Sequence, residues 1–573
     1  MKYKLKGSQN PDIIQRIFEN RNINAEQRHK FLKPVLENIQ NPRIYKNMES
    51  AVRLYLAHVK NGSKILVVVD SDCDGYCSNA AFVNYTKEVL NHNNIVYIMH
   101  EDKRHGFTRS IMEQILEIRP DLVVMIDAGS NDYEEHEILY NTEIPVIILD
   151  HHECEKESKY ALVVNNQLCE DGNKTLSGGG MVMKFMELVD QLTGKNAAEK
   201  YMDLVAVSLV ADSMLMTEEE TRYYVLEGLN NIKNPMLKVF AEEITDKNFN
   251  SISYNIAPSI NSIIRVGDME HKVNLFDALL GSNRTEMIKL RGQGEVEMSL
   301  VDYIIKIASR LKSKQNRIIK RVLEDENTTI ITDNLPITFM FHNDEEALSL
   351  SGLIASKVAE MYDKPALVLR KKDDSFYHGS ARSIDSIPNF KDILENTSKF
   401  DFCQGHQGAF GVKIFINKFN ELLMDLTNTK FKTEETIYEV DAAYVDGVVS
   451  AMDIIAVDEL KNHWCRGFEK PLFYIKLSDI SSREVVTMGA AGNSVKIHKN
   501  YISFVKFKCS EEELDELLKH KNFDMEIIGT FNLNEWNGRT MPQVIIEDFK
   551  VTKRTNELEL DWDDFNAFGG FCA

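Results

Sequence analysis

Acidic and imidazole side chains follow several short apolar runs, and these are the residues of the 573-residue chain best suited to chemistry. The run ILVVV leads into the acids of Asp70-Ser71-Asp72-Cys73-Asp74-Gly75, VVMI leads into Asp127, and VIIL leads into Asp150-His151-His152. A fourth apolar run, LVAVSLVAD, ends at Asp212. If these groups converge, their carboxylates repel one another and some stay protonated at neutral pH unless cations are present.

The mixture of oxygen and nitrogen donors indicates which cations would bind. Carboxylates with a few imidazoles suit Mn²⁺ or Mg²⁺ better than a metal that prefers thiolates. Two such ions can hold both the attacking and the leaving oxygen of a phosphodiester. The pattern therefore predicts two divalent ions and phosphodiester hydrolysis.

The first motif also has a second interpretation, because D-x-D-x-D-G is the first half of a calcium-binding EF-hand loop. The glutamate that such a loop needs at its twelfth position would here be Ala81. The motif also follows a strand-like run, whereas an EF-hand loop follows a helix. Asp150-His151-His152 alone could be a solvated turn, but the other strand ends favour a shared site.

A sheet must position these motifs. From Gly62 onward, short apolar runs alternate with amphipathic segments, which predicts an α/β core with a doubly wound parallel sheet. Ligands of such sheets bind beyond the carboxyl ends of the strands. Acids as far apart as Asp70 and Asp150 are therefore expected to meet in one crevice.

Changes of pattern divide the chain into six expected segments. Helical spacing characterises the first 60 residues, and a charged, proline-free helical pattern covers 285–326. Strand-like runs typical of a small barrel dominate 431–553. The expected division is a helical arm at 1–60, a core at 61–284, a connecting helix at 285–326, a second α/β lobe at 327–430, an OB-like β-barrel at 431–553 and an acidic, aromatic tail at 554–573.

Composition restricts the classes of function. The formal net charge of −21, from 67 basic and 88 acidic residues, argues against nucleic-acid attraction over the whole surface but allows a local basic groove. The first residues lack a secretory apolar segment, and no stretch is long and apolar enough for a membrane span. The eight cysteines form no CxxC pair, so neither a disulfide framework nor a zinc site is indicated. We expect a cytoplasmic monomer.

Together, the motifs resemble the DHH phosphoesterases, a family named for the Asp-His-His triplet found here at 150–152. The match also covers D-x-D-x-D-G at 70–75, Asp-x-Gly at 127–129, the small residues at 177–180 and Asp212. The resemblance implies two metal ions, with His152 close to the scissile phosphate. It implies that the metal ligands are Asp70, Asp72, Asp74, Asp127, His151 and Asp212, and that the catalytic residues are Asp127, Asp150 and His152.

Glycine-rich turns in the second lobe extend the resemblance. Residues 405–411, GHQGAFG, resemble the G-H-x-x-A-x-G motif of the DHH-associated domain, and GSARS lies upstream at 379–383. Such turns let backbone N–H groups approach phosphate, and an arginine there offers a bidentate fork, although the glycines could serve tight turns alone. The substrate contacts expected from the resemblance are Ser380, Arg382, Arg265, Arg104, Gly405 and His406.

The C-terminal third narrows the resemblance to RecJ exonucleases. LNEWNGR at 533–539 and PQVIIED at 542–548 resemble the OB-fold of that family, and APSINSIIRVGD at 257–268 resembles another of its segments. Ser259 and Ile264 depart from the family's arginine and glycine in that segment. The resemblance implies 5′→3′ hydrolysis of single-stranded DNA to 5′-mononucleotides, with the OB domain guiding the strand.

Other functions remain open at this point. A phosphodiesterase with the same chemistry could act on short oligonucleotides or dinucleotides, and a catalytically silent replication scaffold would be another class. The tail, with Trp562, Phe565, Phe568 and Phe571 among its acids, could dock on a partner protein or mimic DNA. Packing on its own barrel, or disorder, is the alternative that the composition favours over these two.

Overall fold

The computed structural model describes residues 1–154, 156–242, 248–290, 292, 294–371, 374–384, 386–428, 437–446, 449–489, 492–536 and 538–555. The chain divides into two compact units, one of residues 33–434 and one that joins residues 1–32 to the part from Glu435 onward. Residues 556–573 of the expected tail lie outside the described residues. No described helix is both long and apolar enough to span a membrane.

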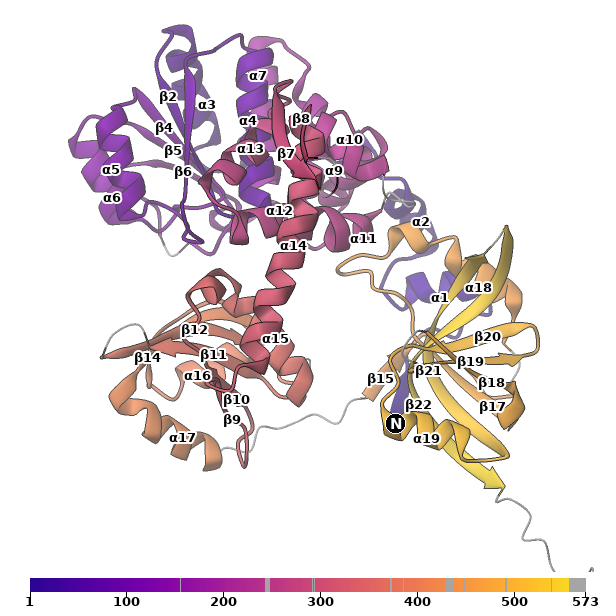
Figure 1. The fold of residues 1–573 in the computed structure, drawn as a ribbon. Coiled ribbons are helices and arrows are strands. Elements are labelled where there is room, and N and C mark those ends of the chain that lie inside the picture. Colours follow the sequence, from indigo (N-terminus) through magenta and orange to yellow (C-terminus); the bar gives the residue numbers. More distant parts are fainter. Residues whose placement is uncertain are drawn as a thin grey trace, which may run out of the picture. The chain divides into compact units, whose positions relative to one another are not determined.

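Residues 65–165 contain a five-stranded parallel sheet (Figure 1). The strands lie in the order β3-β2-β4-β5-β6, so that β3 is on one side of β2 and the later strands are on the other. Ligands of doubly wound sheets bind at such a reversal of strand order, here between β2 and β4. The predicted fold class is confirmed, although β6 was not among the strands expected from the sequence. The strands are β2 (Ile65–Val69), β3 (Ile95–Met99), β4 (Leu122–Ile126), β5 (Val146–Asp150) and β6 (Leu162–Asn165).

Helices cover both faces of this sheet, which explains why its strands are continuous apolar runs. Helices α5 (Arg109–Ile118) and α6 (Tyr133–Asn141) lie on one face, and α3 (Met48–Lys60), α4 (Cys73–Glu88) and α7 (Gly178–Thr193) lie on the other (Figure 1). Thr108 caps the N-terminus of α5, because its hydroxyl accepts a hydrogen bond from the Ile111 N–H. It buries Ile111, Met112 and Ile115 in the core that it shares with the strands.

The fourth apolar run is a helix, α8 (Met202–Ala211). It packs against α4, α7 and α9 (Glu219–Asn230) and is buried on nearly every side. A helix that is buried on all sides has no polar face. Its apolar residues therefore lack the 3.6-residue periodicity by which a helix is distinguished from a strand in a sequence. The remaining helices of this region are α10 (Pro235–Glu242), α11 (Phe249–Ser251), α12 (Ala257–Val266) and α13 (Met269–Leu279).

The connecting helix is shorter than the expected 285–326. Residues 285–299 form a hairpin of β7 (Thr285–Leu290) and β8 (Gly294–Ser299), and helix α14 spans Leu300–Glu324. The turn contains Gly292 and Gly294 at φ of 80° and 78°, a conformation that glycine adopts most easily. Ser299 then caps the helix by accepting a hydrogen bond from the Asp302 N–H.

The second lobe is built on a six-stranded mixed sheet in the order β13-β14-β12-β11-β10-β9. Only β10 and β11 run parallel, and the other neighbouring pairs are antiparallel. Its elements are β9 (Thr329–Ile331), β10 (Thr338–Phe341), α15 (Ser351–Tyr362), β11 (Ala366–Lys371), β12 (Phe376–Arg382), α16 (Phe390–Glu395), β13 (Phe400–His406), β14 (Ala409–Phe415) and α17 (Phe419–Asn428).

The C-terminal part forms a seven-stranded sheet in the order β16-β17-β21-β22-β20-β19-β18. Strands β21 and β22 have 15 and 17 residues, and bulges interrupt their pairing. Its elements are β15 (Ile437–Val440), β16 (Ala442–Tyr444), α18 (Ala451–Asp458), β17 (Phe473–Ser481), β18 (Val485–Met488), β19 (Ser494–Lys499), β20 (Ile502–Lys506), α19 (Glu511–Leu518), β21 (Asn522–Trp536) and β22 (Arg539–Thr555).

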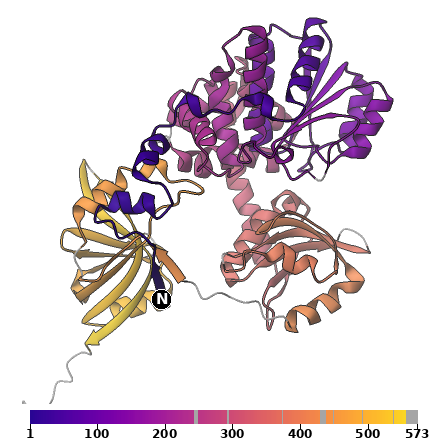
Figure 2. The ribbon, with the colours of Figure 1, turned by 180° about the vertical axis from the view of Figure 1, so that it is seen from behind.

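The first 32 residues contain two helices of the expected arm, but they also contain a strand and join the C-terminal unit. Residues 2–5 form β1 (Lys2–Leu5), which pairs in parallel with β15 (Figure 2). The next elements, α1 (Ile13–Glu19) and α2 (Ala25–Leu32), bury Ile17, Phe18 and Phe31 in the core of the C-terminal sheet. Pairing with a strand that lies more than 430 positions later is a long-range contact, which local sequence patterns do not reveal.

Candidate metal centre

The first acidic motif lies where β2 passes into α4. Asp70 directly follows β2 and is 1% exposed, and Asp72 caps α4 by accepting a hydrogen bond from the Gly75 N–H at 3.0 Å. A side chain at Gly75 would place its Cβ 2.7 Å from the Cβ of Asp70. Glycine is therefore needed here for the helix to begin so close to the end of the strand.

The N-terminus of α7 faces the third acid, Asp74. The N–H groups of Gly178 and Gly179 donate to its carboxylate at 2.9 and 3.1 Å, and the Ser208 hydroxyl donates to it as well. The partial positive charge of a helix N-terminus stabilises such a carboxylate. A Cβ at Gly178 would lie 2.6 Å from the Cβ of Asp127, so small residues let this helix approach the acids.

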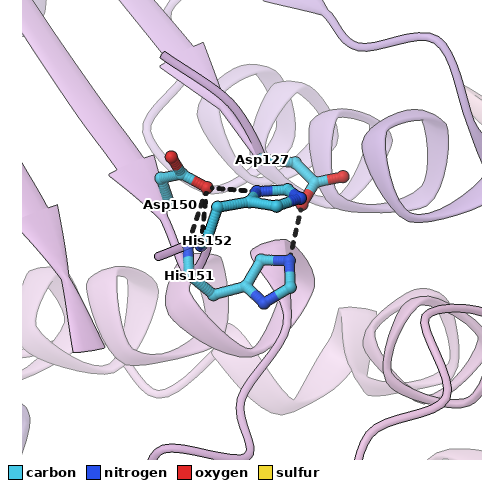
Figure 3. A group of neighbouring side chains, drawn as sticks. All are labelled: Asp127, Asp150, His151 and His152. Atoms are coloured by element: carbon cyan, nitrogen blue, oxygen red, sulfur yellow. Dashed lines mark hydrogen bonds and ion pairs between the residues drawn. The ribbon is translucent and has the colours of Figure 1, made fainter. Parts of the chain in front are cut away.

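Asp127 and His151 meet at the carboxyl edge of the sheet (Figure 3). Nε2 of His151 lies 3.1 Å from Oδ1 of Asp127, 3.4 Å from Oδ2 of Asp212 and 3.9 Å from Oδ2 of Asp74. Asp127 has a φ of 68°, a strained backbone conformation of the kind found at functional sites. One buried imidazole thus faces acids from three separate segments of the chain.

Asp150 is occupied within its own loop. Its Oδ1 atom accepts from the His151 N–H at 2.7 Å, from the His152 N–H at 3.2 Å and from Nδ1 of His152 at 2.8 Å (Figure 3). Its Oδ2 atom accepts from the Ser130 N–H at 3.1 Å, and Asn165 donates to both the Ser130 hydroxyl and the His152 carbonyl. Asp150 therefore fixes the orientation of His152.

The Asp150–His152 pair has opposite effects on the two pKa values. Burial alone would raise the pKa of Asp150, but His152 and the other donors hold it well below its usual range. Burial alone would lower the pKa of His152, but the Asp150 carboxylate outweighs it and raises the pKa to about 10. The Asp150 carboxylate therefore favours the charged form of His152, whose side chain is about half exposed.

Two other acids, Asp127 and Asp74, show the electrostatic strain expected of a site for cations. Burial, followed by the neighbouring carboxylates, raises the pKa of Asp127 well above its usual value, and burial and Asp72 raise that of Asp74 to about 6. Among the described residues, Oδ1 of Asp70, Oδ1 of Asp127 and Nε2 of His151 are buried without a hydrogen bond. These charges and donor atoms fit divalent ions.

Among the described residues, the candidate ligands fall into three groups, two of which share His151, and within each group the donor atoms lie within 4.8 Å of one another. All six residues expected as metal ligands occur in these groups, and Asp127 interacts electrostatically with acids of the other two groups. His105 was missed because its only sequence signal is its place beside a glycine. The groups are Asp70, Asp72 and His105; Asp74, His151 and Asp212; and Asp127, Asp150, His151 and His152.

Three of the expected substrate contacts also come together, at the N-terminus of α15. The Ser380 hydroxyl hydrogen-bonds that of Ser351 at 2.9 Å, and a Cβ at Gly352 would lie 2.6 Å from Nη2 of Arg382. Arg265, at the end of α12, interacts electrostatically with both Arg382 and Asp72. A helix N-terminus beside two guanidinium groups is suited to binding an anion.

Arg104 lies apart from this group, because its Nε atom pairs with Asp102 at 2.8 Å on the exposed surface. The neighbouring Lys103 interacts with Arg265 and Arg382 instead. Lys103 keeps contact with solvent, yet the surrounding protein and these two cations lower its pKa to about 8. Sequence reasoning missed Lys103, since nothing in the local sequence distinguishes it from Arg104.

The last expected contacts, Gly405 and His406, lie in β13. Gly405 has a φ of 131°, and a Cβ there would lie 2.8 Å from the Ala409 carbonyl oxygen, so this glycine serves the close β13–β14 turn. His406 is exposed, and its charge contributes to lowering the pKa of His151. Of these two residues, His406 is the one that interacts electrostatically with a candidate metal ligand, His151.

The two departures in α12 have local structural roles. The Ser259 hydroxyl donates to the Asn255 carbonyl at 2.6 Å, and Ile264 is buried in the core. Serine and isoleucine are not among the residue types, His, Cys, Asp and Glu, that make up the groups of candidate metal ligands. The departures therefore leave the acid and histidine set unchanged.

Comparison with known proteins yields a consistent set of relatives. A model of the DHH family N-terminal domain matches residues 64–209, and one of the RecJ OB domain matches residues 448–548. YorK of Bacillus subtilis, named as an SPbeta prophage-derived single-strand DNA-specific exonuclease, is 34% identical over 98% of this chain and 100% of its own length. The single-stranded-DNA-specific exonuclease RecJ of Bacillus subtilis is 23% identical over 92% of this chain and 66% of its own.

Solved structures show the same fold. Thermus thermophilus RecJ in complex with Mn²⁺ has a TM-score of 0.74 at 19% identity, covering 94% of this chain and 76% of the other. The same protein in complex with Mg²⁺ has a TM-score of 0.69 at 18% identity, covering 96% and 75%.

Proposed function

Because this chain belongs to the RecJ family of single-strand-specific DNA exonucleases, we propose that it degrades single-stranded DNA from the 5′ end to 5′-mononucleotides. The activity is metal-dependent hydrolysis of phosphodiester bonds. The observation that carries the proposal is His151, whose Nε2 lies within 3.9 Å of three acids at the point where the strand order reverses. That geometry supports a two-ion site at the expected edge of the sheet.

The proposed ions are Mn²⁺ or Mg²⁺, and when bound they would supply an activated water and stabilise charge on the reacting phosphate. The α7 N-terminus holds Asp74, and the strained turn at Asp127 aims its carboxylate at His151. The ligands proposed for the ions are Asp70, Asp72, Asp74, Asp127, His151 and Asp212.

His152 has a separate proposed role at the scissile phosphate. Asp150 occupies Nδ1 of His152 and keeps the ring charged, so Nε2 can donate a hydrogen bond to a phosphate oxygen. We assign catalytic roles to Asp127, Asp150 and His152 on this basis. Asp150 acts through His152, and Asp127 belongs to the ion-binding set.

Recognition of the 5′ end is proposed to rest on the anion site at the N-terminus of α15. Ser380, Arg382 and Arg265 would bind the terminal phosphate, with Lys103 as an additional cation. A terminal phosphate carries more negative charge than an internal one, so this cluster would favour strand ends. Arg104, Gly405 and His406 are proposed as further contacts with the strand.

We propose a division of labour that follows the expected segments. The core at 61–284 hydrolyses, the lobe at 327–430 binds the strand end, and the OB domain at 431–553 holds the single strand by stacking and local positive charge. The remaining proposals are that the protein acts as a monomer in the cytoplasm, where DNA is available, and that the tail at 554–573 binds a partner protein.

The test is a time course on long single-stranded DNA labelled at one end or the other, with Mn²⁺ or Mg²⁺ present. Immediate release of a labelled mononucleotide from the 5′ end, with gradual shortening of the 3′-labelled strand, is expected. Activity confined to very short oligonucleotides would instead support a phosphodiesterase. Absence of cleavage with every divalent ion would support a silent scaffold.

A further inference from the structure

His105 lies beside the carboxylate at the end of β2. Its Nδ1 atom is 2.5 Å from Oδ2 of Asp70, and donor atoms of Asp70, Asp72 and His105 all lie within 4.8 Å of one another. The histidine side chain is 47% exposed, whereas that of Asp70 is 1% exposed. An imidazole therefore closes the open side of a buried carboxylate.

The backbone around His105 is held on both sides. The Ser71 hydroxyl donates to the Arg104 carbonyl at 2.7 Å, and the Phe107 N–H donates to Oδ2 of Asp132 at 2.8 Å. Gly106 lies between these bonds with a φ of 70°, and a side chain there would overlap the Asp132 carboxylate. Contacts to the end of β2 and to the start of α6 thus fix the position from which the imidazole reaches Asp70.

Asp70 carries a second, independent indication that a cation binds here. Its Oδ1 atom is buried and has no hydrogen bond among the described residues. A second imidazole, that of His100, is 3% exposed, and its Nε2 lies 3.9 Å from this oxygen, too far for a hydrogen bond. Burying a carboxylate oxygen without a partner is unfavourable, so an ion at this position would satisfy it.

We propose that His105 is a ligand of the first metal ion, together with Asp70 and Asp72, and that it makes this position favour Mn²⁺ over Mg²⁺. Mg²⁺ favours a shell of oxygen atoms, whereas an imidazole suits later divalent ions better. Each of the two ions would then have one histidine, His105 for the first and His151 for the second. The inference rests on the two-ion site of the proposed function and adds a ligand and a metal preference to it.

The competing explanation is that His105 only orients Asp70 by donating a hydrogen bond from Nδ1. Two substitutions separate these roles. In H105N, the side-chain amide can still donate to Asp70 but removes the imidazole ligand. In H105E, a carboxylate supplies an oxygen ligand but cannot donate to Asp70, so it rescues binding only if the residue contacts the ion.

The experiment titrates the full-length protein with Mn²⁺ alone, followed by electron paramagnetic resonance of the free ion, and with Mg²⁺ alone by calorimetry. The wild type should bind two Mn²⁺ ions. In H105N, one of the two should bind at least about tenfold more weakly, as expected when the ligand shell is damaged. In H105E, two-ion binding should return, with the ratio of Mn²⁺ to Mg²⁺ affinity lowered. H29N, which removes an exposed imidazole on α2, is the control and should match the wild type.

Two results would overturn the inference. H105N that binds both Mn²⁺ ions within about threefold of the wild type would show that the imidazole is not a ligand. If H105E instead binds Mn²⁺ and Mg²⁺ more weakly than the wild type, and by the same factor, His105 has the orienting role alone. A wild type that fails to bind two ions would instead contradict the proposed two-ion function, so the two failures are distinguishable.

Discussion

Asp127 and His151 follow neighbouring strands of the parallel sheet, and the distance between Oδ1 of the acid and Nε2 of the histidine is 3.1 Å. The pairing register of β4 and β5 sets this approach, since it places the ends of the two strands side by side. Neither atom has a hydrogen bond in the described part of the chain, and an ion bound by both residues, as proposed, would satisfy both atoms.

The first prediction concerns D127N. Asparagine tolerates a positive φ, so the substitution should leave the turn intact while removing one buried charge from a crowded site. Cleavage should fall by at least about 100-fold, and the increase in Tm on adding Mn²⁺ should largely disappear. Thermal unfolding with and without Mn²⁺, together with an exonuclease assay, measures both effects. Retained Mn²⁺ stabilisation would contradict the assignment of Asp127 as a ligand.

The second prediction concerns the buried His136. Its Nε2 atom lies 3.0 Å from the Gly129 carbonyl oxygen, and its Nδ1 atom lies 3.0 Å from the Ser158 hydroxyl. Burial lowers its pKa to about 4, so the folded state holds this ring neutral while the unfolded chain protonates near pH 6.5. The contribution of the neutral His136 ring to the free energy of unfolding is therefore fully present above about pH 6.5. It is lost as the pH falls toward 4, by an amount on the order of 3 kcal/mol.

Urea denaturation of wild type and H136N between pH 4 and 8 tests this. H136N should be less stable than the wild type at pH 8, and the gap should narrow on acidification. Parallel pH profiles for the two proteins would show that His136 does not titrate as its surroundings imply.

The third prediction concerns R382A. Loss of the guanidinium at the α15 N-terminus should raise KM for 5′-phosphorylated DNA by about tenfold or more, and should reduce the preference for a 5′-phosphate over a 5′-hydroxyl end. The free energy of unfolding should change little, because Arg382 is only partly buried. R317A, on the exposed face of α14, is the matched control. An unchanged preference for the 5′-phosphate would refute the proposed end recognition.

The fourth prediction concerns removal of the C-terminal sheet. Since Ile17, Phe18 and Phe31 belong to its core, a fair test deletes residues 1–32 as well and keeps 33–434. This fragment should retain most of its activity on short oligonucleotides and lose about tenfold or more on long strands, which depend on stacking and charge along the strand. Steady-state rates on substrates of graded length provide the measurement. Equal losses at every length would argue against a guiding role for the OB domain.

Most of the candidate site could be predicted from the sequence because Asp70, Asp127 and Asp150 stand at the ends of strands, and the ends of parallel strands share one edge of a sheet. Asp212 instead follows the helix α8. The same reasoning could not find His105 or Lys103. Both lie in a segment without regular secondary structure, and their roles depend on contacts with Asp70 and with Arg265 and Arg382. These contacts join residues that are distant in the sequence, so they produce no periodic pattern of residue types in the local sequence.

Two errors in the fold have related physical causes. The helical pattern of α14 was extended backward over 285–299, where the glycines at 292 and 294 turn the chain into a hairpin. The strand at 2–5 was missed because four residues with exposed side chains have no pattern of burial to read. Short, exposed strands depend on their partners, which only the folded chain supplies.

The parallel pairing of β1 with β15 has a consequence for how the protein is made. Residues 1–32 leave the ribosome before their partners from residue 437 onward, which follow only after the roughly 400 residues of 33–434. At bacterial or eukaryotic translation rates this takes about 20–80 s. During that interval Ile17, Phe18 and Phe31 have no C-terminal core to enter. Nascent chains of this protein should therefore depend on chaperones at their first helices, and a translational pause before residue 437 should increase aggregation.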